Sequence, residues 1–323
     1  MRALGVLVPP YDADPGDPAD RPIGRAALRL EAEGVAVVFG HRAASGVLRG
    51  VRATPDGWFP TAAAVAAAYD RFPSRSRPEA YAALRAGLPD TPIANPPSLV
   101  DLCSDKLACQ GVLTHLPVPE LEADPARFAA TLRSWGTAFL KPRYGAFGRG
   151  VRRVTPGDPL PGRGEGALPG VTEPLFLHRA VPPPAGWAGI ACRILVQRTP
   201  DGWHVCPAVA RRHRTDPVVN AARGAEVVPL QHAAPAAVEP VAALARQAAV
   251  ALGALPDGDL LVELGVDIVL DAQHQPWLIE VNSRPRGRLE ALARLDPARW
   301  QEAHVQACAR PLRTLAARAA GNG

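Results

Sequence analysis

The chain has 323 residues, of which 47% are hydrophobic and 21% charged, a composition typical of a soluble globular protein with about two domains. Lys and Arg exceed Asp and Glu by 36 − 31 = 5 charges, and no basic run concentrates them, which argues against a nucleic-acid partner. We expect neither a membrane span nor a signal peptide, because no apolar run is long enough and Pro and Asp follow early. Five cysteines without CxxC or framework spacing favour buried thiols, a reducing compartment and a cytoplasmic location.

The N-terminal third predicts a βαβ start, which favours a parallel sheet covered by helices. Its expected elements are a strand at 4–8, a helix at 23–33, a strand at 35–39, a hairpin of 47–53 with 57–59, and a helix at 78–88. The Pro-rich residues 91–98 predict a linker. We therefore place the first domain at residues 1–97.

The rest of the chain predicts a middle domain at 98–174 and a C-terminal domain at 175–323. The expected elements are helices at 99–114, 124–135, 236–252 and 300–320, strands near 118 and at 137–141, 151–154, 175–178, 192–197 and 203–210, and a hairpin within 260–282. A glycine-rich turn occupies 145–150, and the Pro/Gly-rich residues 156–170 are typical of the loop of a flexible flap. Neither a GxGxxG fingerprint opening a helix nor a GxxxxGK[ST] loop occurs, so a dinucleotide-binding or P-loop protein is excluded.

Lysine is rare in this chain: Lys106 and Lys141 are the only lysines among 36 basic residues. Arginine replaces lysine where charge alone matters, whereas the compact ammonium group fits between phosphate oxygens. Lys141 ends an apolar strand before the glycine-rich turn, a pattern that indicates a phosphate-binding flap in which Arg149 is placed to reach a γ-phosphate. The alternative is a surface hairpin with an isolated lysine, and Lys106 by itself predicts only a solvated helix charge.

The C-terminal hairpin carries the most specific pattern. If Leu270 pairs with Trp277, strand alternation places Asp267, Glu280 and Asn282 on one face, with the two acids directly opposite each other. Facing carboxylates repel unless a cation neutralises them. Two acids and an amide oxygen are ligands that suit Mg²⁺ bound together with substrate phosphates. The alternative is an acidic solvent face on an ordinary hairpin.

Together these features resemble the ATP-grasp superfamily: a lysine on a helix, a second lysine before a glycine-rich loop, and a D…ExN hairpin near the C-terminus. More narrowly, the chain resembles the YheC/YheD (spore-coat-associated) branch, with some likeness to RimK-type ligases. The matching segments are YDRFP (69–73), DK (105–106) through LP (116–117), FLKP (139–142) with its glycine loop, ELGVD (263–267) and WLIEVNSRP (277–285). The resemblance implies an α/β ATP-grasp fold with an N-terminal parallel-sheet domain, a small lid domain and a C-terminal antiparallel-sheet domain.

The resemblance also implies roles for individual residues. The implied ATP-binding residues are Lys106, Lys141, Gly145, Gly148, Arg149, Gly150, His178, Arg179 and Val181, the last three lying in the hinge that receives adenine. The implied Mg²⁺ ligands are Asp267, Glu280 and Asn282. The implied catalytic residues, which handle the γ-phosphate and the carboxylate substrate, are Arg193, Arg211, Asn220 and Arg223. The chain departs from the family at Ala191, where an Asp is frequent, and at 182–184, where three prolines leave no acid for the ribose.

The implied activity is an ATP-dependent carboxylate–amine ligase acting on small-molecule or peptide substrates. A carboxylate attacks the γ-phosphate to give an acylphosphate and ADP, and an amine then displaces phosphate to give an amide. The alternatives are a phosphotransferase on the same scaffold and a low-turnover structural or coat-associated ATP-binding protein, against which the complete lysine and acid set argues. ATP-grasp enzymes are often oligomers, so a homo-oligomer is an expectation.

Overall fold

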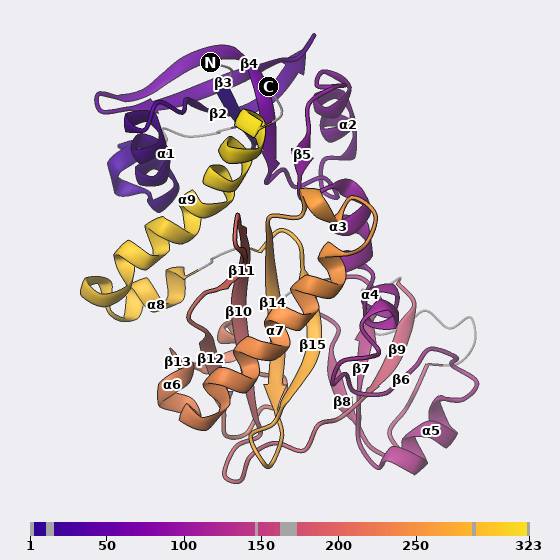
Figure 1. The fold of residues 1–323 in the computed structure, drawn as a ribbon. Coiled ribbons are helices and arrows are strands. Elements are labelled where there is room, and N and C mark those ends of the chain that lie inside the picture. Colours follow the sequence, from indigo (N-terminus) through magenta and orange to yellow (C-terminus); the bar gives the residue numbers. More distant parts are fainter. Residues whose placement is uncertain (1–2, 11–15, 146–147, 162–172, 286–288, 322–323) are drawn as a thin grey trace.

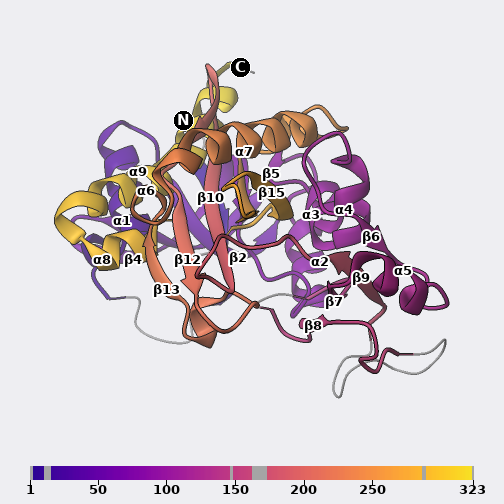
Figure 2. The same ribbon diagram turned by 90° about the horizontal axis from the view of Figure 1, so that it is seen from below.

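The computed structural model describes residues 3–10, 16–145, 148–161, 173–285 and 289–321. These residues form three sheets, one for each successive part of the chain, with the helices packed between and around them (Figure 1). Turned by 90°, the molecule shows α7 crossing the C-terminal sheet, with the middle sheet and α5 to one side (Figure 2). None of the described helices has the length and apolar character needed to cross a membrane.

The N-terminal sheet is mixed. Its strands are β1 (Ala3–Leu7), β2 (Val37–Ala44), β3 (Val47–Thr54), β4 (Gly57–Asp70) and β5 (Ile93–Ala94), accompanied by the helices α1 (Pro22–Ala32) and α2 (Pro78–Ala86). β1 lies parallel to β2 and to the end of β4, and β5 extends this parallel part, as predicted. β3 pairs antiparallel with β2 and with the start of β4, which confirms the hairpin expected at 47–53 with 57–59 and adds antiparallel pairings to the parallel part. The predicted linker at 91–98 contains β5 and the start of the next helix.

The middle sheet is small and antiparallel, in the order β6-β9-β7-β8. Its strands are β6 (Leu121–Glu122), β7 (Ala138–Pro142), β8 (Arg152–Val154) and β9 (Leu175–Arg179), and its helices are α3 (Pro97–Ser104), α4 (Lys106–Val112) and α5 (Phe128–Trp135). β9 pairs with β6 and β7, so this sheet continues five residues past the expected boundary at 174.

The helix predicted at 99–114 is broken at Asp105. Asp105 has an extended backbone (φ −91°, ψ 101°), and its side chain accepts from the N–H groups of Leu107 and Ala108. These bonds cap the N-terminus of α4, where backbone N–H groups have no partner within the helix. The break places Lys106 at the first position of α4.

The C-terminal sheet is antiparallel, in the order β13-β12-β10-β14-β15, with β11 paired to the end of β10. Its strands are β10 (Gly189–Thr199), β11 (Gly202–Val205), β12 (Val209–His213), β13 (Glu226–Pro229), β14 (Glu263–Leu270) and β15 (Pro276–Asn282), and the helices of this part are α6 (Leu230–Ala233), α7 (Val238–Gly253), α8 (Glu290–Leu295) and α9 (Pro297–Gly321). Short 3₁₀ helices lie at Pro18–Asp20, Ala221–Arg223, Pro235–Ala237 and Gly258–Leu260. The apolar face of α7 packs on β14 through residues that include Leu244, Ala248 and Val266.

α9 ends the chain but packs against its beginning. Val305, Cys308 and Leu312 belong to the same buried cluster as Leu4 and Phe39 of the N-terminal sheet. Figure 1 shows this helix, in yellow, crossing between the N-terminal sheet and β10. Burial of this apolar surface joins the first and last parts of the chain into one body.

Residues of the N-terminal part also form hydrogen bonds with residues 283–285, which follow directly after β15. Asn95 donates to the carbonyl oxygen of the first of these residues (2.5 Å), and Arg71 donates to that of the last (2.7 Å). Arg284, between them, donates to the buried carboxylate of Asp70 (2.5 Å). The YDRFP motif at 69–73 therefore fixes the chain immediately beyond Asn282.

Candidate functional site

The register of β14 and β15 places Asp267 opposite Glu280, as predicted. The expected pairing of Leu270 with Trp277 is wrong by one residue, because Trp277 lies opposite Val269. The ladder shifts between Asp267 and the next residue along β14, so that one residue of β15 has no partner there. Because this β-bulge lies beyond Asp267, it shifts the pairing of Trp277 by one residue and leaves the two acids opposite each other.

Asp267 is surrounded by donors from the neighbouring strands. Arg193 bonds both carboxylate oxygens, with its Nε 2.9 Å from Oδ1, and Arg211 Nη2 lies 3.0 Å from Oδ1. Asn282 Nδ2 adds a bond of 3.2 Å to Oδ2. Burial acts to raise the pKa of Asp267, but the charges and hydrogen bonds of the two arginines outweigh it and lower that pKa. Arg193 meets Asp267 because the two residues are paired across β10 and β14.

Arg211 has a hydrogen-bond donor that it does not use within the described residues. Its Nε is buried and has no hydrogen-bond partner among the described residues. A buried donor without a partner costs free energy that a bound anion can recover. Arg193 and Arg211, both predicted as catalytic, are thus together beside Asp267, and one of them retains an unused donor.

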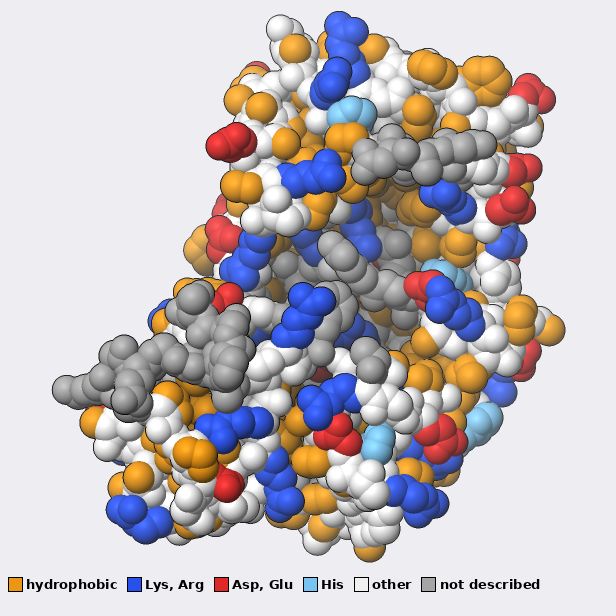
Figure 3. Space-filling model, turned by 180° about the vertical axis from the view of Figure 1, so that it is seen from behind, with side chains coloured by type: hydrophobic (Ala, Val, Ile, Leu, Met, Phe, Trp, Pro, Cys, Tyr) orange, Lys and Arg blue, Asp and Glu red, His pale blue; other side chains and the backbone are white. Residues whose placement is uncertain are grey.

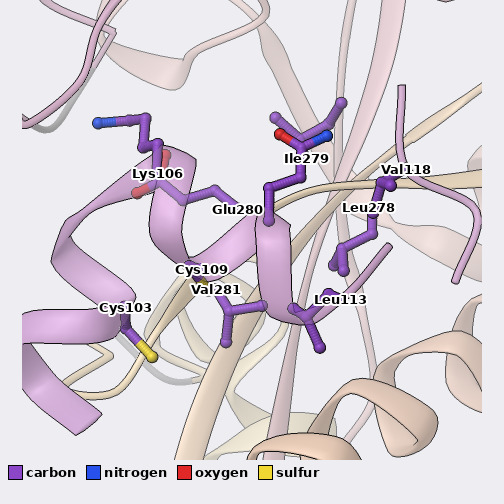
Figure 4. Close-up of a pocket in the computed structure, with 10 residues that line it drawn as sticks. Cys103, Lys106, Cys109, Leu113, Val118, Leu278, Ile279, Glu280 and Val281 are labelled. Carbon is purple, nitrogen blue, oxygen red and sulfur yellow. The ribbon is translucent and has the colours of Figure 1, made fainter. Parts of the chain in front are cut away.

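Glu280 lies in a pocket with Lys106. Figure 4 shows its side chain extending toward that of Lys106, with the apolar residues of α4 and β15 around them. Burial raises the pKa of Glu280, and the positive charges of Lys106, Arg193 and Lys141 act against that rise. Within the described residues no hydrogen bond to the Glu280 carboxylate is present. A half-buried carboxylate in this state favours a cation as its partner.

The two lysines approach from the middle part of the chain. Lys106 Nζ donates to the carbonyl oxygen of Gly145 (2.8 Å), at the start of the glycine-rich turn. Lys141 Nζ lies 2.7 Å from Nδ1 of His178 on the neighbouring strand β9. Burial lowers the pKa of Lys106, and it lowers the pKa of Lys141 to about 8. Seen from behind, Lys and Arg side chains gather around the hollow between the N-terminal part and the rest of the molecule (Figure 3).

The glycine-rich turn is described except for residues 146–147, which lie outside the described residues. Gly145, Gly148 and Gly150 have φ values of +107°, +69° and +68°, which disfavour any residue with a side chain. A Cβ on Gly148 would lie 3.7 Å from Nδ2 of Asn220. The turn, which also carries Arg149, therefore lies against the loop that contains Asn220.

Arg223 and the hinge residues lie at the margin of this arrangement. Arg223 Nε donates to Asp216 (2.7 Å), so this predicted catalytic residue is held by its own loop. The N–H of Arg179 donates to the carbonyl oxygen of Glu120 (2.8 Å), whereas the N–H of Val181 makes no backbone hydrogen bond to any described residue. Within the part of the chain that the structure describes, the Val181 N–H thus has no partner at the expected adenine site.

The residue types fit a divalent cation. The described residues contain no group of three or more His, Cys, Asp or Glu side chains placed to hold a metal ion. The candidate set has two acids, Asp267 and Glu280, and the amide oxygen of Asn282, and such oxygen ligands suit Mg²⁺ when phosphates complete the coordination.

Gln110 is a residue of the site that the sequence analysis did not identify. Its Nε2 donates to the carbonyl oxygen of Pro119 (2.7 Å) and lies 3.2 Å from Nε2 of His178. The available signal was its position four residues after Lys106, which places both on one face of a helix. Such a position is common for solvated glutamines as well.

The three sheets, with lysines of the middle sheet region facing acids of the C-terminal hairpin, define an ATP-grasp fold. Residues 190–308 match the family model of the YheC/D-like ATP-grasp proteins, which confirms the expected resemblance. A search of curated proteins found no match.

Three solved structures illustrate the likeness. D-cycloserine synthetase DcsG is 18% identical with a TM-score of 0.56, and the match covers 95% of this chain and 99% of that chain. The ATP-grasp ligase PsnB, complexed with a minimal precursor, is 17% identical with a TM-score of 0.55 over 95% and 98%. A RimK domain ATP-grasp protein from Sphaerobacter thermophilus is 19% identical with a TM-score of 0.53 over 96% and 97%. At these identities the likeness shows the fold.

Proposed function

We propose that the protein is an ATP-dependent carboxylate–amine ligase that forms an amide bond through an acylphosphate and releases ADP and phosphate. One observation carries the proposal: Glu280 of the C-terminal hairpin lines a pocket together with Lys106, and the charges of Lys106, Lys141 and Arg193 act on its carboxylate. Cations from the middle part of the chain and from β10 of the C-terminal sheet thus converge on an acid of that same C-terminal sheet. Such a concentration of opposite charges is expected where a highly charged ligand binds.

Lys106 and Lys141 bind the α- and β-phosphates of ATP in this proposal. Both lysine side chains are half-buried, and this partial burial lowers the pKa of each. Phosphate oxygens replace the water that these groups lost on folding. The glycine-rich turn at 145–150 covers the triphosphate, and the N–H of Val181 binds the adenine.

Asp267, Glu280 and Asn282 would hold Mg²⁺, which neutralises phosphate charge during phosphoryl transfer. The unused Nε of Arg211 binds an oxygen of the γ-phosphate or of the substrate carboxylate. Arg193 stands beside it and adds positive charge at the same place. Charge that develops during transfer is stabilised by these fixed guanidinium groups.

The reaction needs no nucleophile from the protein. The substrate carboxylate oxygen attacks the γ-phosphorus and ADP leaves; the amine nitrogen then attacks the acyl carbon, loses a proton, and phosphate leaves. The structural neighbours include ligases and synthetases, among them D-alanyl-alanine synthetase A from Vibrio cholerae (TM-score 0.50, 13% identity, 98% and 99% covered). Their names support small-molecule or peptide substrates for this chain as well.

The test is ATP turnover by the full chain with Mg²⁺ and pooled amino acids and small peptides, beside K141A. The proposal expects pool-dependent ADP and phosphate, no turnover by K141A, and a hydroxamate when hydroxylamine intercepts the acylphosphate. AMP in place of ADP, or pool-dependent turnover that K141A retains, contradicts it. Phosphate transfer that leaves a stable phosphorylated product, with no amide formed, favours a phosphotransferase.

A further inference from the structure

Lys141 is oriented by neutral groups. Its Nζ lies 2.7 Å from Nδ1 of His178 and 5.7 Å from the centre of the Phe139 ring. In the described part of the chain Lys141 forms no ion pair with a carboxylate. Its positive charge is therefore held in place without being neutralised by a direct contact.

His178 is neutral and its tautomer is fixed by its partners. The residue is 2% exposed, and burial, together with the charge of Lys141, lowers its pKa well below the usual value. An ammonium group only donates, so the Nδ1 that lies 2.7 Å from Lys141 Nζ accepts, and the hydrogen of the neutral ring lies on Nε2.

The ring nitrogen that carries the hydrogen is Nε2. Gln110 Nε2 donates to the carbonyl oxygen of Pro119 (2.7 Å) and lies 3.2 Å from Nε2 of His178, so this side of the ring faces the carbonyl. A carbonyl oxygen has two lone pairs, so one remains for the ring N–H after Gln110 has donated. Nδ1 consequently carries a lone pair and accepts from the Lys141 ammonium group.

We propose that His178 is a positioning residue of the nucleotide site: its Nδ1 directs the Lys141 ammonium group toward the phosphates while leaving its charge intact, and Gln110 with Pro119 fixes the ring. This inference rests on the proposed function. A carboxylate at this position would form an ion pair that a phosphate has to displace. A neutral acceptor avoids that competition.

The same contacts join the two phosphate-binding lysines. Gln110 belongs to α4, which begins at Lys106, whereas Lys141 and His178 lie on the adjacent strands β7 and β9. Gln110 of α4 thus holds the Pro119 carbonyl beside the His178 ring, and that ring contacts Lys141 of the middle sheet. Loss of the ring contact is expected to disturb the spacing between the two ammonium groups.

The test measures ATP affinity in the presence of Mg²⁺ by calorimetric titration of the full chain, for wild type, H178Q, H178E, H178L and K141A. H178L removes the acceptor and is expected to weaken ATP binding on the order of 10- to 100-fold. H178Q supplies a neutral acceptor and is expected to stay within about threefold of wild type. H178E supplies a charged acceptor and is expected to bind ATP more weakly than H178Q. The melting temperature without ligand reports any purely structural effect.

The outcomes separate the inference from the proposed function. If H178L and H178E bind ATP as wild type does while K141A does not, the positioning role is overturned and the phosphate site stands. If K141A binds ATP as wild type does, the proposed nucleotide site fails and the inference fails with it. If H178L does not fold, equal affinity of H178Q and H178E overturns the inference, and weaker binding by H178E supports it.

Discussion

Arg193 and Asp267 face each other across β10 and β14 and form a two-point ion pair, with Arg193 Nε 2.9 Å from Oδ1. With the bonds from Arg211 and Asn282, the Asp267 carboxylate accepts four hydrogen bonds. A carboxylate offers about four lone-pair positions, so its accepting capacity is filled. A cation reaches Asp267 only when one of these donors moves away.

R193A is therefore expected to bind Mg²⁺ more tightly than wild type when no nucleotide is present. Removal of the guanidinium group frees two acceptor positions on Asp267 and removes a competing positive charge. Turnover is expected to fall, because the same group stabilises the transferred phosphate. Mg²⁺ titration followed by thermal unfolding measures the effect, and equal Mg²⁺ affinity of the two proteins contradicts it.

E280Q is expected to raise the Mg²⁺ concentration that turnover requires without lowering the stability of the free protein. Burial raises the pKa of Glu280, so the folded protein disfavours its charged form, and a neutral amide leaves the free protein at least as stable at pH 8. Turnover is expected to require Mg²⁺ at concentrations higher on the order of tenfold. Thermal unfolding without ligand tests the stability, and Mg²⁺ titration of turnover tests the metal requirement. An unchanged Mg²⁺ requirement would mean that the hairpin acid is structural.

Lys141 predicts a pH dependence of ATP binding. Its folded-state pKa is lowered to about 8 from 10.5, so between these values the unfolded chain binds more protons and stability of the free protein rises with pH. ATP binding needs the ammonium form, so affinity is expected to fall as pH rises above about 8. Titrations at pH 7 and pH 9 measure this. K141R stays charged over this range and is expected to show no such loss; a wild-type affinity that is constant over the range contradicts the prediction.

Loss of the ion pair between Arg284 and Asp70 is expected to destabilise the fold, although neither residue is proposed to contact ATP or Mg²⁺. R284A leaves the fully buried carboxylate of Asp70 without its ion-pair partner and is expected to lower the free energy of unfolding by about 3–5 kcal/mol at pH 8. Burial raises the pKa of Asp70 and Arg284 opposes that rise, so the loss is expected to shrink as pH falls and the carboxyl group is protonated. Urea unfolding at pH 8 and pH 5 tests this. A loss of equal size at both values would show that the ion pair is not its cause.

The candidate site could be predicted from sequence where it depends on strand alternation. The pairing of Asp267 with Glu280 follows from local pattern, and the bulge next to it left that pairing unchanged while it shifted Trp277 by one position. Arg193 also lies beside Asp267, although its place came from family resemblance. The roles of these residues stay predictions.

Other features depend on contacts that no local pattern encodes. The break at Asp105 needs the side chain to cap α4, and the apolar spacing on both sides of it reads as one helix. β4 continues as a strand through an alanine-rich stretch because pairing with β3 and β1 outweighs the helical propensity of alanine. The contact of His178 with Lys141 joins residues 37 positions apart and depends on the register of β9.

The central claim is that the lysines of the middle part and the acids of the C-terminal hairpin bind one Mg²⁺–ATP. The most direct measurement is calorimetric ATP binding with and without Mg²⁺ for wild type and K141A, with R246A, an exposed cation on α7, as the matched control. The account predicts Mg²⁺-enhanced binding by wild type and R246A and a loss of binding by K141A that remains folded. Undiminished Mg²⁺–ATP binding by K141A would contradict it.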